Sequence, residues 1–376
     1  MHFAWLGEAT SQFARSAFRT QGGSMIDNIK HCLMRRCAIY VADAAQNGRT
    51  ITHITDDLNQ INRVLRMSQL ATALSEASGD LFSVGKRISG HAYLVPLIRP
   101  LHLNYLDVFE FSREPIREFF PRHRLSPKVE AYLDLVGRSE ELLSYYKNSR
   151  GQSDYAFILR YCELLNRFAD EFRDRVSSSE CIKKDKNQSR LVNSNIASAR
   201  SFLGKMFSLE PGALVVVMDL YCEGVSYVAG EATEEFSFSR KRRDQFFRLI
   251  RKKAKVLGVI GYLWRLEYSR FKGYYYTTVF LFRANVLGQL ESIIADIGEM
   301  WTNVEFVSGQ YGCWFVDPAI SSDSGEELIS GGSVDRKSNI EDFVVGLLKS
   351  DCHFRVSVDS RYPVFMTGEC DVTQLK

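Results

Sequence analysis

Two β-strands joined by a tight turn are predicted by residues 259–282, VIGYLWRLEYSRFKGYYYTTVFLF. Both halves are rich in aromatic and β-branched residues, which favour a pleated strand. Phe271, Lys272 and Gly273 stand between the halves, at the place where the chain has to reverse. Side chains two apart in a strand point to the same face, so each strand places aromatic rings on both sides. The stretch therefore predicts an antiparallel hairpin at the heart of a sheet.

The segments around this hairpin predict a sheet combined with helices. Residues 213–222, ALVVVMDLYC, form a nearly continuous apolar run that is typical of a buried central strand. A basic helix at 239–257 precedes the hairpin, and a helix at 285–301 and a strand within 304–316 follow it. A capping box of Ser338 and Glu341 then opens a last helix. This order predicts an α+β fold with a ferredoxin-like core.

Composition also predicts how the chain divides into domains. Apolar residues recur at helical spacing in the first half, for example at Leu58, Ile61 and Leu65, and prolines punctuate its middle. A polar stretch follows, which is typical of a linker. We predict a helical amino-terminal domain at 1–175, a linker at 176–194, an α+β domain at 195–358 and a carboxy-terminal tail at 359–376.

Overall composition limits the classes of function. The net charge of the 376 residues is only +3, so a nucleic-acid-binding surface has to come from local clustering of Lys and Arg residues. The eight cysteines show neither a C-x-x-C pair nor zinc-ligand spacing, and we expect reduced thiols, no metal and no cofactor. No apolar run approaches the ~20 residues of a membrane helix, and residues 1–21 resemble an amphipathic helix rather than a signal peptide. We expect a cytoplasmic bacterial protein with no membrane partner.

The hairpin also contains a frame of residues that resembles a known family. The frame consists of Gly261, Trp264, Leu266, Glu267, Tyr268, Lys272, Gly273 and Tyr274. It resembles the core hairpin of the inovirus-type replication-protein family, also called the YagK/YfjJ carboxy-terminal domain family. That family belongs to the HUH (His-hydrophobic-His) replication initiators. The resemblance covers roughly residues 195–358 and implies a ferredoxin-like, HUH-type antiparallel-sheet domain, as well as an ancestral activity of nicking single-stranded DNA.

Two positions of this frame decide which chemistry the resemblance implies. In the family a His-x-His pair holds a divalent ion, which polarises a phosphate for attack by a tyrosine. This chain has Tyr275 and Thr277 at those positions. A phenol with its usual pKa of ~10 stays protonated at neutral pH, and Glu267, which matches a family glutamate, does not hold a metal tightly alone. The resemblance therefore implies a centre without its metal.

The nucleophile of the family is replaced as well. In the family a late helix contains the tyrosine, and the matching residues here are 343–355, with Gly346 at the tyrosine position. Asp351 and Arg355 keep the frame of that helix. We therefore expect no catalytic residue but a degenerate site formed by Glu267, Tyr275, Thr277, Gly346 and Lys349.

The helix at 239–257 is strongly basic, with Asp244 as the only acid between 239 and 256. Phe246, Phe247 and Ile250 give it one buried side, so the charges crowd the opposite side. Such a stripe attracts phosphates without reading bases, although a merely solvated face is the alternative. The candidate phosphate contacts are Arg240, Lys241, Arg242, Arg243, Arg251, Lys252, Lys253 and Lys255.

Three functions agree with these patterns. The first is a nucleic-acid-binding protein, with DNA favoured over RNA, that descends from a rolling-circle initiator and acts in mobile-element replication control or phage defence. The aromatic residues of the hairpin would then either stack on unpaired bases at an open sheet face or pack in the core. The second is an active single-strand nickase that uses another tyrosine, among Tyr274–Tyr276. The third is a scaffold whose helical domain binds a protein partner.

Overall fold

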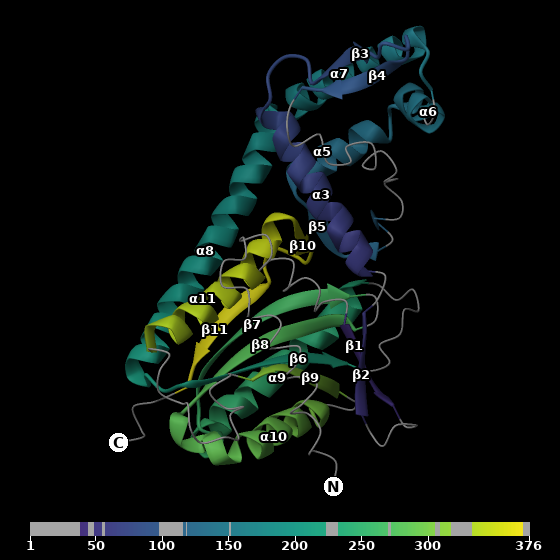
Figure 1. Ribbon diagram of the computed structural model, residues 1–376. Helices are drawn as coiled ribbons and strands as arrows, with labels where there is room; N and C mark the ends of the chain where they lie inside the picture. Colours follow the sequence, from purple (N-terminus) through teal and green to yellow (C-terminus); the bar gives the residue numbers. More distant parts are fainter. Residues whose placement is uncertain are drawn as a thin grey trace. The chain divides into compact units, whose positions relative to one another are not determined.

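The computed structural model shows two compact units (Figure 1). The described part of the first lies within Met1–Thr55, Asn193–Ser350 and Val356–Lys376, and that of the second within Asp56–Val192 and Asp351–Arg355. The residues that the structure describes are 38–43, 49–54, 57–97, 116–117, 119–149, 152–222, 232–269, 272–304, 309–316 and 333–370.

A five-stranded sheet forms the centre of the first unit, and all neighbouring strands in it are antiparallel. The hairpin predicted from residues 259–282 supplies two of these strands, with Glu267 directly opposite Tyr275. The apolar run that ends at Cys222 forms the strand beside the hairpin. The predicted α+β class is thus confirmed. From edge to edge the strands are β11 (Phe365–Glu369), β7 (Val259–Ser269), β8 (Gly273–Phe282), β6 (Leu214–Cys222) and β9 (Gly309–Val316).

Two helices cover one face of this sheet and enclose an aromatic core. They are α9 (Ala232–Leu257) and α10 (Leu290–Thr302), the latter preceded by the 3-10 helix η3 (Ala284–Gln289). Phe247 of α9 stacks on Tyr262 of β7 with 4.3 Å between ring centroids. Phe246 meets Trp301 of α10 edge to face at 5.3 Å. Such pairs contribute about 0.5–1.5 kcal/mol each beyond the area they bury.

The opposite face of the sheet is covered as well. Arg265 of β7 donates a hydrogen bond to the Leu347 carbonyl of α11 (Ser333–Lys349). The carboxy-terminal part of α8 (Ser179–Leu209) comes so close at Gly261 that a Cβ there would lie 2.8 Å from Phe202 Cζ. Every residue of β7 and β8 is buried as a result. Of the two alternatives for the aromatic residues of the hairpin, packing in the core is therefore the one that the structure shows.

The second unit is mainly helical, as the spacing of its apolar residues predicts. Tyr132 lies at its core, with ring centroids 5.5 Å from Phe168 and 6.0 Å from Phe172. Two small sheets accompany the helices, one of β3 with β4 and one of β5 with β10. The elements are α3 (Asp57–Glu76), β3 (Phe82–Lys86), β4 (Ala92–Pro96), β5 (His123–Leu125), α5 (Pro127–Val136), α6 (Glu140–Asn148), α7 (Tyr155–Val176) and β10 (Phe354–Val356).

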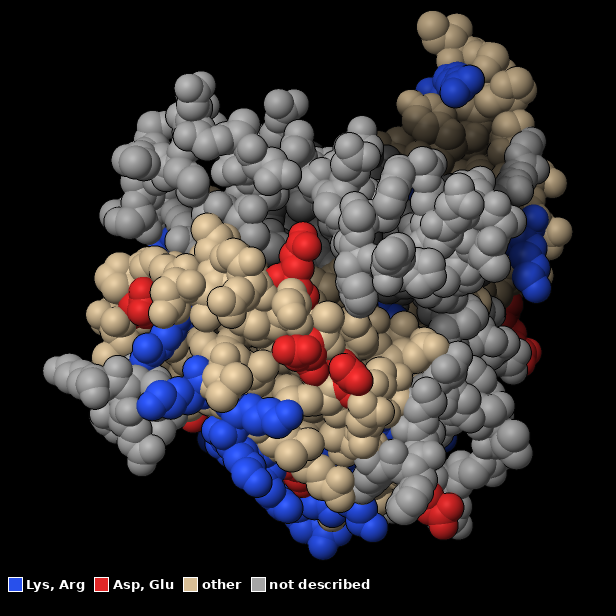
Figure 2. Space-filling view, turned by 90° about the horizontal axis from the view of Figure 1, so that it is seen from below, with Lys and Arg blue, Asp and Glu red and all other residues tan. Residues whose placement is uncertain are grey.

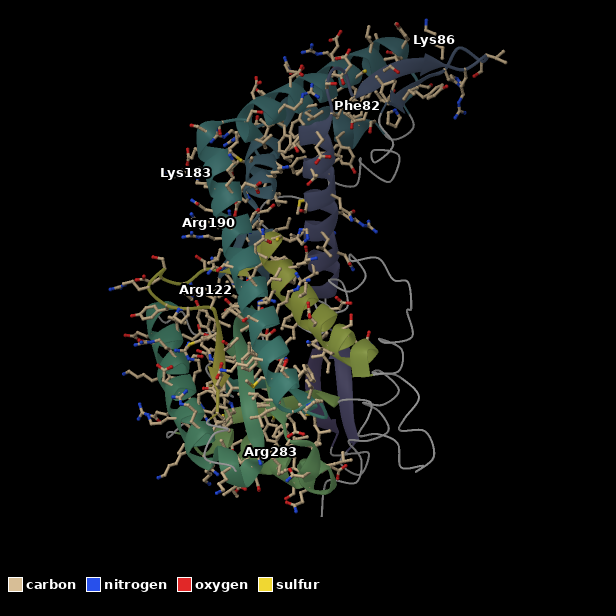
Figure 3. All side chains as sticks on the ribbon, turned by 90° about the vertical axis from the view of Figure 1, so that its left-hand side faces the viewer. Phe82, Lys86, Arg122, Lys183, Arg190 and Arg283 are labelled. Atoms are coloured by element: carbon tan, nitrogen blue, oxygen red, sulfur yellow. The ribbon has the colours of Figure 1, made fainter. Side chains whose placement is uncertain are left out.

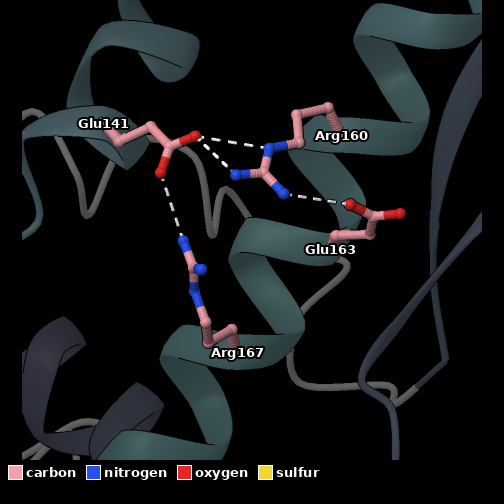
Figure 4. A network of polar contacts seen from close by, with 4 residues as sticks. All are labelled: Glu141, Arg160, Glu163 and Arg167. Atoms are coloured by element: carbon pink, nitrogen blue, oxygen red, sulfur yellow. Dashed lines mark hydrogen bonds and ion pairs between the residues drawn. The ribbon is translucent and has the colours of Figure 1, made fainter.

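A polar network on the surface of this unit connects α6 with α7 (Figure 4). Glu141 accepts hydrogen bonds from Arg160 Nη2 at 2.8 Å and from Arg167 Nη2 at 3.2 Å. Arg160 also pairs with Glu163 at 3.2 Å. The hydrogen bond from Arg160 is the main reason why the pKa of Glu141 lies below its ordinary value. These side chains are exposed, so the network adds little to stability.

Several predicted boundaries differ from the structure. The predicted linker at 176–194 is helical from Ser179 onward, because its polar residues lie on the solvated sides of α8. Residues 38–54, predicted to be helical, contain the paired strands β1 (Ala38–Asp43) and β2 (Arg49–Ile54). The predicted tail includes the edge strand β11, and α11 begins at Ser333, ahead of the capping box expected at Ser338. The helix predicted at the start of the chain lies outside the described residues.

Candidate functional site

A row of polar side chains crosses the centre of the sheet, on the face that α11 covers. Asp219 of β6, Thr277 of β8 and Arg265 of β7 lie side by side in register. Glu267 and Tyr275 form the neighbouring pair on the same face, two residues further along the hairpin. We call this group the buried polar cluster, and its members, each no more than 6% exposed, are Asp219, Arg265, Glu267, Lys272, Tyr275 and Thr277.

Both carboxylates of the buried polar cluster are paired with cations. Asp219 accepts a hydrogen bond from Thr277 Oγ1 at 2.8 Å and another from Lys272 Nζ at 2.8 Å. Glu267 Oε1 lies 3.0 Å from Arg265 Nη1. The ammonium of Lys272 is also 4.8 Å from the centre of the Tyr275 ring. Two negative and two positive side chains thus balance each other out of contact with water.

This balance suits a structural role better than metal binding. A divalent ion needs oxygen or nitrogen ligands free of competing cations, and here Lys272 and Arg265 already occupy the carboxylates. In the described ranges of the chain, no group of three or more His, Cys, Asp and Glu side chains is placed to hold a metal ion. The cluster therefore neutralises its own charge instead of providing a cation site.

The structure places the predicted degenerate residues around this cluster. Glu267, Tyr275 and Thr277 belong to it, and Gly346 and Lys349 lie on α11, whose Leu347 carbonyl accepts the hydrogen bond from Arg265. The sequence reasoning missed Asp219, Arg265 and Lys272 as members. The signal for Asp219 and Arg265 was a charge within an apolar strand, because buried charges occur almost only where they are paired, and Lys272 stands in the turn beside them.

The burial of Tyr274, Tyr275 and Tyr276 argues against their activation as nucleophiles. Tyr274, Tyr275 and Tyr276 are 4%, 1% and 0% exposed. Burial raises the pKa of Tyr276 to about 12, and its hydroxyl accepts a hydrogen bond from Ser239 Oγ at 3.3 Å. Activation requires the opposite change, a lowered pKa or an adjacent base. These tyrosines are core residues of the sheet, and they do not stack on bases.

Two of the predicted phosphate contacts on α9 belong to its buried side. Arg242 is 0% exposed and donates to the Trp301 carbonyl at 2.6 Å, with its guanidinium 4.9 Å from the Trp301 ring. Arg243 lies 4.3 Å over the Trp264 ring and pairs with Asp244 at 2.6 Å. The prediction that Arg242 and Arg243 bind phosphates is therefore wrong, since both guanidinium groups are used inside the fold.

Most of the other Lys and Arg side chains of α9 face the solvent. Arg240 is half-buried above the Tyr362 ring, at 4.6 Å. Arg251 is exposed but held in place, because its Nη1 donates to the Tyr262 hydroxyl at 2.6 Å. Figure 2 shows a band of Lys and Arg side chains on this unit, largely apart from the acidic ones. The exposed basic face of α9 consists of Lys241, Arg248, Arg251, Lys252, Lys253 and Lys255.

Comparisons with known proteins add no relative to this picture. No family model, no curated protein and no solved structure matches the chain. Among the described residues, none of the helices has both the length and the apolar character needed to cross a bilayer.

Proposed function

We propose that this chain is a DNA-binding protein derived from an inovirus-type rolling-circle initiator, with an HUH-type nicking centre that is inactive. Its setting is replication control of a mobile element or phage defence. The strand order supports the ancestry. The element order β6, α9, β7, β8, α10, β9, with β6 and β8 adjacent in the sheet, agrees with the order expected of a ferredoxin-like core. The hairpin frame that resembles the family occupies the centre of that core.

The exposed basic face of α9 is the observation that carries the binding proposal. From Lys241 to Lys255 the helix is about 21 Å long. Duplex DNA has about 12 phosphate charges over that length. Asp244 lies within the stretch but is paired with Arg243, so it opposes the field little. The aromatic rings beneath the helix hold its backbone in place, so the ordering cost of binding falls on the Lys and Arg side chains and not on the helix.

The buried polar cluster supports the proposal of an inactive centre. Hydrolytic or transfer chemistry at a phosphate needs a metal or another electrophile, a nucleophile and access for the substrate. Lys272 and Arg265 neutralise the acids, and residues 273–282 of β8 are buried throughout. Among the described residues, β8 leaves no exposed side chain on this face for a phosphodiester to contact. The frame of the old centre then serves the stability of the fold.

The binding proposal is tested by removing exposed charges from α9. We expect the variant K241Q/K252Q/K253Q/K255Q to bind a fluorescent DNA duplex more weakly at every sequence. Each phosphate contact contributes about 0.9 to the slope of log K against log salt, so the slope should fall by roughly 3 to 4. Fluorescence anisotropy across a salt series measures both quantities.

A matched control removes the same charge elsewhere. Lys147, Lys183, Lys186 and Arg190 are exposed on α6 and α8, and Lys183 and Arg190 are labelled in Figure 3. We expect the variant with glutamine at all four to keep most of the affinity and the slope. Equal losses in both variants would mean that only net charge matters. A wild-type protein with no affinity at low salt would contradict the function itself.

A further inference from the structure

The β3–β4 hairpin of the second unit is firmly held at its base. The side chain of Asn166 on α7 accepts from the backbone N–H groups of Leu81 and Phe82, both at 3.0 Å, and donates to the Phe82 carbonyl at 3.0 Å. Further along, the Ala92 N–H donates to the Ser153 carbonyl at 3.0 Å. Figure 3 shows Phe82 against the helices and Lys86 at the far end of the hairpin. The β3–β4 hairpin, residues 82–96, is therefore anchored to α7 at its base, and its tip projects away from the helices. We call this hairpin the arm.

The tip of this arm has an unusual composition for a turn. Residues 86–91 are all exposed, and Ile88 is 111% exposed relative to its reference state. Gly90 adopts a φ of 82°, which closes the turn with hydrogen bonds between Arg87 and Gly90 and between Arg87 and His91. Turns usually present Asn, Asp, Gly or Ser to water. Ile88 buries no apolar surface in the described structure, so its side chain is accessible to a ligand beside the two basic residues.

The charges of the arm indicate which ligand fits. No acidic residue occurs between Leu81 and Leu97, and Lys86 and Arg87 flank Ile88 on one side. Both cations lie over aromatic rings, with Lys86 Nζ 4.0 Å from the centre of the Tyr155 ring and the Arg87 guanidinium 5.7 Å from the centre of the Tyr93 ring. Asp154, which follows Ser153, has its carboxylate engaged by the Phe157 N–H at 2.8 Å as the cap of α7. The arm thus presents positive charge beside one apolar side chain.

We propose that the tip of the β3–β4 hairpin inserts into the minor groove of duplex DNA, with Ile88 as a wedge against a base step. Lys86 and Arg87 contact the phosphates that border the groove. Proteins that enter the minor groove combine these two features, since basic side chains hold the backbone while an apolar side chain unstacks and bends the duplex. The choice of DNA rests on the proposed function. Insertion of the hairpin tip requires a minor groove, so we expect this site to prefer duplex over single-stranded DNA.

The test separates the two chemical roles of the tip. We expect K86Q/R87Q to weaken binding to a 30-base-pair duplex by about tenfold at low salt and to lower the salt slope by roughly 2, with little change for a single strand. We expect the wild type to bend the duplex by roughly 20–90°, measured by energy transfer between end labels, and I88S to lose most of that bend. All three positions are exposed, so circular dichroism should show unchanged folding.

Several outcomes would overturn the proposal. One is an unchanged bend in I88S, and another is an equal loss of duplex and single-strand affinity in K86Q/R87Q. A third is an equal loss in the charge-matched control K183Q/K186Q.

A membrane is the alternative ligand for the tip. If the wild type binds anionic vesicles, and I88S abolishes this binding without changing the DNA affinity, the tip is a membrane contact. If the α9 variant loses affinity while the hairpin variants behave as wild type, the proposed function stands and this inference alone fails. If the wild type binds no DNA, both fail.

Discussion

Lys241 and Arg243 are two residues apart on α9 and have opposite environments. Lys241 is exposed, whereas Arg243 is 5% exposed and lies over the Trp264 ring. In an α-helix two residues are separated by a rotation of about 200°, so one side chain can face the solvent while the other faces the core. Arg243 lies on the same helical side as Phe246, Phe247 and Ile250. That spacing was a signal in the sequence, and the basic composition of the helix obscured it.

His353 illustrates how burial of one residue makes stability depend on pH. It is half-buried in the second unit, its Nδ1 lies 2.9 Å from Ser68 Oγ, and desolvation lowers its pKa below the ordinary 6.5. Its unfolded form then binds a proton more readily than its folded form. The contribution to stability is complete above about pH 6.5 and is lost as the pH falls below that value toward the folded pKa.

We therefore expect H353Q to flatten the pH dependence of stability in this range. The melting temperature of the wild type should fall more steeply than that of H353Q between about pH 6.5 and pH 5. Differential scanning fluorimetry of both proteins across that range gives the comparison, and H91Q, at an exposed histidine, serves as the control. Parallel curves for wild type and H353Q would show that His353 titrates alike in the folded and unfolded states.

The contact between β7 and α11 depends on one arginine. Arg265 pairs with Glu267 at 3.0 Å and donates to the Leu347 carbonyl, with both acidic and basic side chains at most 2% exposed. Removing one partner of a buried ion pair leaves the other charge without compensation, at a cost of about 3–5 kcal/mol. We expect R265M to lose that much free energy of unfolding, measured by urea titration.

The double variant R265M/E267L tests whether the uncompensated charge is the cause. It removes both charges, so we expect it to recover more than half of the loss. R248M, on the exposed face of α9, should change stability by less than about 0.5 kcal/mol. If the double variant is as unstable as R265M, the hydrogen bond to Leu347, and not the charge of Glu267, is what matters at this contact.

At the scale of the whole molecule, the covered sheet predicts the absence of nicking. We expect no cleavage of a labelled single-stranded oligonucleotide with Mg or Mn and no covalent adduct on a denaturing gel. In the described part of the chain no three His, Cys, Asp or Glu side chains are grouped to hold a metal ion, and burial raises the pKa of Tyr276 to about 12. A retarded species that disappears on changing one tyrosine to phenylalanine would show an active nucleophile. An active nicking enzyme on the same oligonucleotide serves as the positive control.

Much of the first unit was predictable from local patterns. The hairpin, the apolar strand at 214–222 and the helix after the hairpin follow from alternation, apolar runs and helical spacing, which depend on near neighbours in the sequence. The predicted linker was wrong because polar composition describes exposure and not secondary structure, and α8 is helical there. The edge strand β11 is too short to show a pattern, and it exists only through its pairing with β7.

The sequence by itself determined the β7–β8 hairpin, the strand β6 and the helices α9 and α10, and that Tyr275, Thr277 and Gly346 replace the groups that the resemblance implies. Only the tertiary structure decided that both faces of the sheet are covered, and that Asp219, Lys272, Arg265 and Glu267 compensate one another. The physical reason is distance along the chain. Periodicity reports the side on which a residue lies, whereas charge pairing and burial depend on segments far apart, such as β6 with β8 and β7 with α11.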